Sequence, residues 1–195
     1  MRVKICGITN LEDASMCEEL GVDAVGFVHF PGRGRSLPLE TIAGICSSLG
    51  PMVAKVLVCA PINPAEALQM IDRSNADVIQ VHSLDPEGVG EIRGQGTKVI
   101  RAVPPIRSEA LRFAGVADAL LFEHGTPGTG TPYDFSVVPI DACQRAIIAG
   151  GLNPENLETA KALRPYALDV SSGVERKVGK KDPGLVAEFI RRCKS

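Results

Sequence analysis

The sequence contains no tryptophan, and aromatic residues make up only 4% of its 195 residues. Hydrophobic residues nevertheless reach 45%, so valine, isoleucine, leucine and alanine must fill the interior. Aliphatic side chains of this kind suit strands that are buried on both faces, as in parallel sheets. The shortage of aromatic residues therefore favours an α/β protein with a core of parallel strands.

Strong charge and long apolar runs are also missing. The formal net charge is only −2, which gives no electrostatic basis for binding nucleic acid. No run of 18 apolar residues occurs, so we expect no transmembrane helix and no membrane partner. Met1 leads directly into the apolar segment 3–8, so we expect no signal peptide.

Clusters of metal-ligating residues are absent too. The six cysteines form no Cys-x-x-Cys motif and the three histidines are scattered, so we expect no metal site. A chain of this size and apolar content can fold without disulfides. We therefore expect reduced thiols and a cytoplasmic location.

Short apolar segments alternate with helical patterns along the whole chain. Strands are predicted over 3–8, 24–30, 52–60, 78–82, 98–103, 119–123, 145–149 and 167–170. Helices are predicted over 11–20, 39–49, 63–71, 89–93, 108–113, 154–163 and 183–193, with a single helical turn at 135–138. Eight βα units of this kind close a (β/α)₈ barrel. An open doubly wound sheet is the alternative, but the first turn lacks Gly-x-Gly-x-x-Gly. We therefore predict a single-domain (β/α)₈, or TIM, barrel over residues 1–195.

Two turns rich in small residues follow the seventh and eighth predicted strands. They contain Gly150 and Gly151, and Ser172 and Gly173. Glycine lets a backbone approach a ligand closely, and barrels commonly bind phosphate at these two loops. Ordinary polar strand-to-helix turns are the alternative, but the presence of two such turns favours a phosphate site.

A thiol and a carboxyl group end two other predicted strands. Cys6 ends the first strand and has the same strand parity as Lys4, while Glu123 directly follows the apolar run 120–122. A carboxyl group at such a position is partly desolvated, which raises its pKa toward the range of a general acid. Cys6 as a buried hydrophobic residue and Glu123 as a rim charge are the alternatives. As a pair they suit proton transfer at carbon, for example an isomerisation, without metal or redox cofactor.

Other candidates lie on the same rim. Arg35 is either a surface charge or a group that holds a substrate carboxylate through two parallel hydrogen bonds. Gln80 and His82 are either ligand contacts or a satisfied polar pair in the core. The glycine-rich segment 125–132 is a plain connection, a lid or a phosphate cradle. Asp169, inside the eighth strand, is expected to form hydrogen bonds within the barrel.

Five stretches of the sequence, taken in order, resemble the phosphoribosylanthranilate isomerase family. They are Val3-Lys4-Ile5-Cys6-Gly7-Ile8-Thr9, Gly26-Phe27-Val28 with 31–35, Gln80-Val81-His82, Gly128-Thr129-Gly130 with Asp134-Phe135, and Ala149-Gly150-Gly151-Leu152 with 169–175. They span nearly the whole chain, and the first and last are the most specific.

The resemblance implies a (β/α)₈ barrel and an Amadori rearrangement without cofactor. The family converts N-(5′-phosphoribosyl)anthranilate, a phosphorylated small molecule, to 1-(2-carboxyphenylamino)-1-deoxyribulose 5-phosphate in tryptophan biosynthesis. Cys6 matches the general base that takes the C2′ proton, so a lowered thiol pKa is expected. Arg35 matches the arginine that contacts the anthranilate carboxylate. The positions that match the phosphate-binding turns are Gly150, Gly151, Ser172 and Gly173.

Two positions depart from the family pattern. The family usually has aspartate at the end of strand six, where this chain has Glu123, and the extra methylene moves the carboxyl by roughly 1.5 Å. The common Pro-Lys-Ser-Pro-Arg of the second loop is replaced by 31–35, which leaves Arg33 as an alternative to Arg35. An isomerase of another phosphorylated aminosugar and a non-catalytic phosphoribosyl-ligand binder therefore remain as alternatives. The sequence also leaves a homodimer open.

Overall fold

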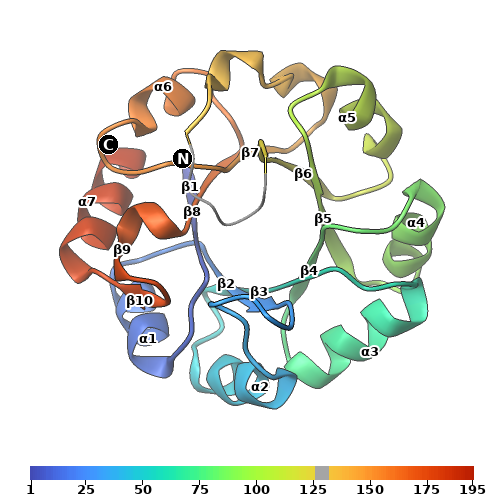
Figure 1. Cartoon of the computed structure of the whole chain (residues 1–195), viewed down its shortest axis with the longest axis horizontal. Helices are drawn as coiled ribbons and strands as arrows, with labels where there is room; N and C mark the ends of the chain where they lie inside the picture. Colours follow the sequence, from blue (N-terminus) through green and yellow to red (C-terminus); the bar gives the residue numbers. More distant parts are fainter. Residues whose placement is uncertain (126–131) are drawn as a thin grey trace.

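Eight parallel strands form a closed barrel in this computed structural model, which describes residues 1–125 and 132–195 (Figure 1). The strands are β1 (Arg2–Cys6), β2 (Ala24–His29), β3 (Ala54–Cys59), β4 (Val78–Val81), β5 (Lys98–Val103), β6 (Ala119–Phe122), β7 (Ala146–Ile148) and β8 (Ala167–Val170). They are hydrogen-bonded in chain order, and β8 closes the barrel by pairing with β1. The predicted (β/α)₈ barrel is therefore confirmed.

Helices surround the strands in a ring (Figure 1). They are α1 (Leu11–Glu19), α2 (Leu39–Ser48), α3 (Pro64–Ser74), α4 (Pro86–Gly94), α5 (Arg107–Phe113), α6 (Leu157–Lys161) and α7 (Pro183–Lys194). The described part of the β6–β7 connection holds two short 3₁₀ turns instead, η1 (Phe135–Val137) and η2 (Ile140–Ala142). Within the described ranges, no helix is long and apolar enough to cross a membrane.

Side-chain caps explain where several helices begin. Asn10 accepts a hydrogen bond from the backbone N–H of Asp13, and Asn63 accepts one from that of Glu66, so both helices start where the sequence predicts. The helix predicted over 89–93 starts earlier, because Asp85 caps it and a proline follows at its first position.

One prediction of local structure was wrong, and one element was not predicted. The helix predicted over 154–163 is confined to α6, because Asn153 and Asn156 bond each other's backbone and hold the preceding residues in a turn. The β8–α7 connection contains an unpredicted hairpin of β9 (Glu175–Lys177) and β10 (Lys180–Lys181), preceded by the 3₁₀ turn η3 (Ser172–Val174).

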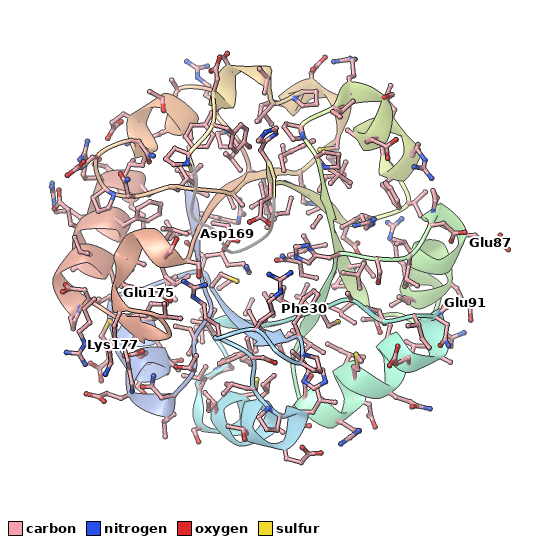
Figure 2. The ribbon with its side chains drawn as sticks, in the orientation of Figure 1. Phe30, Glu87, Glu91, Asp169, Glu175 and Lys177 are labelled. Carbon is pink, nitrogen blue, oxygen red and sulfur yellow. The ribbon has the colours of Figure 1, made fainter. Side chains whose placement is uncertain are left out.

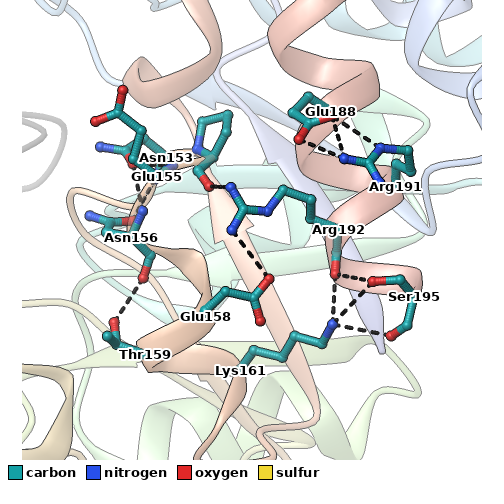
Figure 3. Close-up of polar contacts among 11 residues, drawn as sticks. Asn153, Glu155, Asn156, Glu158, Thr159, Lys161, Glu188, Arg191, Arg192 and Ser195 are labelled. Atoms are coloured by element: carbon teal, nitrogen blue, oxygen red, sulfur yellow. Dashed lines mark hydrogen bonds and ion pairs between the residues drawn. The ribbon is translucent and has the colours of Figure 1, made fainter.

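The last helix is fastened to α6 by polar contacts as well as by packing (Figure 3). Arg192 donates to the carbonyl of Pro154 and lies 3.4 Å from the carboxylate of Glu158. Lys161 donates to the carbonyl of Arg192 at 2.7 Å. These bonds hold the end of the chain against the turn that follows β7, which is one wall of the site described next.

The side chains of the strands divide into two layers. Those that point outward, such as Val3, Phe27 and Phe122, join the main core beneath the helices. Those that point inward form smaller clusters, one of which contains Cys6 with Val56 and Val58. Alternation along each strand therefore places Cys6 inside the barrel, where it faces the cavity at the strands' C-terminal ends.

Candidate active site

A cavity of about 330 Å³ opens at the C-terminal ends of the strands. Eight of the nine residues predicted for the site line this cavity: Cys6, Arg35, Gln80, His82, Glu123, Gly150, Gly151 and Ser172. Its walls also include Arg33, Gly34, Asp169 and Ser171. Segments far apart in the sequence thus meet in one concave site of the size that a small molecule requires.

Cys6 is the last residue of β1 and is only 8% exposed. The prediction of a lowered thiol pKa was wrong for this structure. Burial raises the pKa of the Cys6 thiol, and the nearby ammonium group of Lys4 only opposes that rise. The alternation of side chains along the strand places Lys4 on the same face as Cys6, but it does not show how deeply Cys6 is buried. The cost of removing the Cys6 thiolate from water is therefore visible only in the structure.

Beneath Cys6, Lys4 and Asp169 form an ion pair inside the barrel. Their Nζ and Oδ1 atoms are 2.9 Å apart, and their side chains are 3% and 8% exposed. The pairing of β1 with β8 sets Lys4 opposite Asp169, and this bond fulfils the expectation that Asp169 bonds within the barrel. Burial would lower the pKa of Lys4, but the Asp169 carboxylate outweighs burial and raises it, so the lysine stays charged.

Arg35 is held in place from two sides. Its guanidinium donates two bonds to Glu175, Nε to Oε1 at 2.8 Å and Nη2 to Oε2 at 2.7 Å. Gly7 makes room for it, because a Cβ there would lie 2.6 Å from Cδ of Arg35. Arg33, the alternative in the same loop, also lines the cavity but is exposed to solvent.

Glu175 and Lys181 were missed as parts of the site. Lys181 is fully buried and donates to Glu175 at 3.0 Å and to the carbonyl of Ser171 at 3.1 Å. Burial would raise the pKa of Glu175, but Arg35 and Lys181 outweigh it and hold the pKa below its usual range. The sequence signal was Glu175 itself, which ends the polar stretch after β8. Its partners Arg35 and Lys181 could not be predicted, because the hairpin of β9 and β10 brings Lys181 to Glu175.

Gln80 and His82 point into the cavity from β4 and the residue after it. Gln80 Nε2 and His82 Nε2 are 3.1 Å apart, so the two form a polar pair. Burial lowers the pKa of His82 to about 4, helped by the charges of Arg101 and Lys4, so the imidazole is neutral near pH 7. Among the described residues, Gln80 Oε1 is buried without a hydrogen-bond partner, so it can accept a bond from a bound ligand.

Glu123 is half-buried immediately after β6. Its backbone N–H still bonds Val103 of β5 at 3.1 Å, which fixes the start of its side chain. Its Cγ lies 3.5 Å from where a Cβ on Gly150 would stand, so glycine keeps the carboxyl group clear of the β7 turn. Most of the predicted lid or cradle segment 125–132 lies outside the described residues.

The turns after β7 and β8 close the other side of the cavity. Gly150 and Gly151 have φ values of 90° and 66°, in the left-handed region that favours glycine. Ser172 lines the cavity, but Gly173 does not. A Cβ on Gly173 would lie 1.9 Å from the carbonyl oxygen of Leu152, so close contact between the two turns explains this glycine.

Within residues 1–125 and 132–195, no group of three or more His, Cys, Asp or Glu side chains could hold a metal ion. The chemical groups of the cavity are instead a thiol, carboxylates, a guanidinium group and turns rich in glycine and serine. Such a set can bind an anion and move protons.

Comparisons with known proteins show which family the chain resembles over its whole length. Residues 3–192 match the family described as N-(5′-phosphoribosyl)anthranilate (PRA) isomerase. The phosphoribosyl anthranilate isomerase of Thermus thermophilus has 40% sequence identity, with a TM-score of 0.92 over 100% of this chain and 98% of that one. A phosphoribosyl anthranilate isomerase in complex with reduced 1-(o-carboxyphenylamino)-1-deoxyribulose 5-phosphate has 35% identity and a TM-score of 0.89 over the same shares.

A third similar structure is of monomers generated from the dimeric phosphoribosylanthranilate isomerase of Thermotoga maritima. It has 34% identity and a TM-score of 0.88, and the match covers 100% of this chain and 98% of that one. The match to the family over almost the whole chain, together with a closed barrel that gathers the predicted residues in one cavity, shows that the chain belongs to the N-(5′-phosphoribosyl)anthranilate isomerase family.

Proposed function

We propose that the chain catalyses the reaction for which its family is named, as a step of tryptophan biosynthesis. The substrate is N-(5′-phosphoribosyl)anthranilate and the product is 1-(2-carboxyphenylamino)-1-deoxyribulose 5-phosphate, and no cofactor takes part. One observation carries the proposal: Cys6 and Glu123 line the same cavity as the glycine turn after β7 and the serine turn after β8.

The two protonatable groups have complementary roles in this proposal. Glu123, as general acid, gives a proton to the furanose ring oxygen. The C1′–O bond then breaks, and the anthranilate nitrogen forms a C1′=N Schiff base. Cys6, as general base, takes the C2′ proton, and the released electron pair forms the C1′=C2′ bond of an aminoenol. Tautomerisation to the ketone completes the isomerisation.

The remaining predicted residues bind the two ends of the substrate. Arg35 contacts the anthranilate carboxylate, and its bonds to Glu175 support this role because they fix the plane of the guanidinium group. Gln80 and His82 contact polar groups of the middle of the substrate. Gly150, Gly151 and Ser172 bind the phosphate, whereas Gly173, also predicted for this role, lies outside the cavity lining and lets the β8 turn pack against Leu152.

The decisive measurement follows the fluorescence decay of phosphoribosylanthranilate, made in situ from anthranilate and phosphoribosyl pyrophosphate. Removing a general acid or base costs on the order of 10² to 10⁴ in rate, and we expect this loss in Cys6→Ala and in Glu123→Gln. Cys143→Ala and Glu109→Gln remove the same groups far from the cavity and should keep full activity. Turnover near the wild-type rate in Cys6→Ala or Glu123→Gln would disprove the roles given to them.

Glu123 stands where the family usually has aspartate, and a separate variant tests whether this difference affects activity. We expect the wild type to be active and Glu123→Asp to be slower, because a shift of about 1 Å in a catalytic group can cost on the order of a hundredfold. An inactive wild type that gains activity as Glu123→Asp would instead favour another phosphorylated aminosugar as substrate. Tight product binding without turnover in both proteins would favour a non-catalytic binder.

We further propose one cytoplasmic domain over residues 1–195 that forms a homodimer. The dimeric state of the Thermotoga maritima protein supports this assembly. Exposed apolar side chains support it as well, since Leu11 of α1, Val178 of the β9–β10 turn and Leu185 of α7 are 44%, 65% and 38% exposed. Light scattering on the purified chain tests the proposal, and a monomer mass at high concentration would contradict it.

A further inference from the structure

The ion pair of Lys4 and Asp169 has no part in the proton transfers described above. It lies inside the barrel, and Asp169 projects toward the middle of the ring of strands, whereas Glu87 and Glu91 of α4 project outward (Figure 2). Removing two charges from water is costly, and an apolar pair at such a position is often equally stable. Stability alone therefore does not explain why these charges are buried beneath the site.

The geometry around Gly26 connects this pair with Cys6. A Cβ built on Gly26 would lie 2.9 Å from Sγ of Cys6 and 3.1 Å from Nζ of Lys4, so both atoms border the same small space. Gly26 is the register partner of Cys6 on the adjacent strand. The absence of a side chain there lets the ammonium group approach to within the roughly 6 Å at which an opposite charge favours an ionised group.

Four charged groups act on the Cys6 sulfur from the surrounding elements. Lys4 on the same strand and Lys181 of β10 favour the thiolate, while Asp169 of β8 disfavours it. Arg35 interacts with Cys6 from the loop after β2. Each of these cations also bonds a carboxylate, Lys181 and Arg35 with Glu175 and Lys4 with Asp169. Lys4, however, is the cation that borders the same small space beside Gly26 as the Cys6 sulfur, so its field acts most directly on the thiol.

We propose that Lys4 is a positioning residue for Cys6, whose ammonium group stabilises the thiolate that takes the substrate proton, and that Asp169 holds Lys4 in place. This inference rests on the proposed function of Cys6 as general base. It deepens that function because it names the group that stabilises the negatively charged Cys6 sulfur in a buried site. Burial by itself works against a thiolate, so the base needs a fixed counter-charge within the barrel.

The test measures the reactivity of Cys6 without any turnover. The folded protein, without substrate, is alkylated with iodoacetamide over a range of pH, and the rate for the peptide that contains Cys6 is followed by mass spectrometry. Only the thiolate reacts, so the midpoint of the rate profile reports its formation. We expect Lys4→Met to raise the midpoint by about one to three pH units, the usual size of the effect of a nearby opposite charge.

Asp169→Asn gives a prediction of opposite sign. It removes the negative charge near Cys6, while the asparagine amide oxygen can still accept the bond that holds Lys4 in place, so the alkylation midpoint should fall. A residue with only a structural role would not shift the midpoint in opposite directions when each partner is changed. An unchanged midpoint in Lys4→Met, or a raised one in Asp169→Asn, would overturn the proposal.

Matched variants keep the test interpretable. Lys55 and Asp77 form a second lysine–aspartate pair, at 3.0 Å. This pair lies at the N-terminal ends of β3 and β4, away from Cys6, so Lys55→Met should leave the Cys6 midpoint unchanged. If Lys4→Met fails to fold, the double variant Lys4→Met/Asp169→Asn leaves no unpaired charge and should still show a raised midpoint. Normal turnover in Cys6→Ala would refute the role of Cys6 as base. An alkylation midpoint that is the same in Lys4→Met and in the wild type would refute only the role of Lys4.

Discussion

Carboxylates are used differently at the two ends of the barrel. At the N-terminal ends, one aspartate precedes each of β2, β4 and β6 and accepts the backbone N–H of a residue on the strand before it. The bonds are Asp23 with Val3 at 2.8 Å, Asp77 with Lys55 at 2.8 Å and Asp118 with Val99 at 2.9 Å. These three side chains join neighbouring strands.

At the C-terminal ends, the carboxylates belong to the cavity. Asp169 pairs with Lys4 beneath the thiol, Glu175 pairs with Arg35, and Glu123 lines the cavity wall. The cavity at the N-terminal end has a larger volume, about 520 Å³ against about 330 Å³. Its lining is mainly apolar and basic, and its two carboxylates, Asp23 and Asp118, are the ones that join strands. The chemical groups that line each cavity, rather than its volume, therefore distinguish the C-terminal end of the barrel, which holds the candidate active site, from the N-terminal end, where the carboxylates stabilise the strands.

Glu175→Gln should give the largest effect of the changes that test this contrast. It leaves Lys181 buried without its charge partner and removes the carboxylate that fixes the plane of the Arg35 guanidinium group, so the free energy of unfolding should fall by about 3 kcal/mol and KM should rise about tenfold. Urea unfolding and steady-state kinetics measure the two changes. Glu188→Gln breaks an exposed pair with Arg191 and serves as control. A stable Glu175→Gln variant with normal KM would show that the network does not hold Arg35.

His82 should make stability depend on pH at the cavity end. Its pKa is about 4 in the folded protein and about 6.5 when unfolded, so between these values the unfolded chain binds the proton more readily. Its contribution is therefore present above pH 6.5 and is lost as pH falls toward 4, and it amounts to about 2 kcal/mol between pH 7 and pH 5. Urea unfolding at both pH values should show that His82→Gln loses less stability on acidification. Equal losses in variant and wild type would contradict this assignment.

Asp118→Ala should have the smallest effect, and it is confined to stability. It removes the acceptor for the N–H of Val99, a fully buried residue, and we expect a loss of about 1 kcal/mol with unchanged kcat/KM. Thermal unfolding and the fluorescence assay measure the two quantities. A change in kcat/KM without a change in stability would break the distinction between the ends of the barrel.

Local patterns predicted most of the fold. β5 and β8 have the predicted bounds, and the asparagines that start α1 and α3 cap them as expected. The hairpin of β9 and β10 escaped prediction, because its two short strands carry mainly charged residues and are fixed by Glu175, Lys181 and neighbouring elements. Strand pairing of this kind depends on tertiary contacts, which the periodicity of hydrophobic residues along the sequence does not show.

The sequence by itself determined the barrel, through eight apolar segments at a steady spacing, and it also determined which residues end the strands. Only the tertiary structure decided how deeply those residues are buried and which charged groups they contact. Cys6 is buried above a lysine–aspartate pair, and Arg35 is fixed by a glutamate 140 positions away. The reason is physical: hydrophobic periodicity is a property of neighbouring residues, whereas desolvation and charge pairing depend on which distant segments the closed barrel brings together.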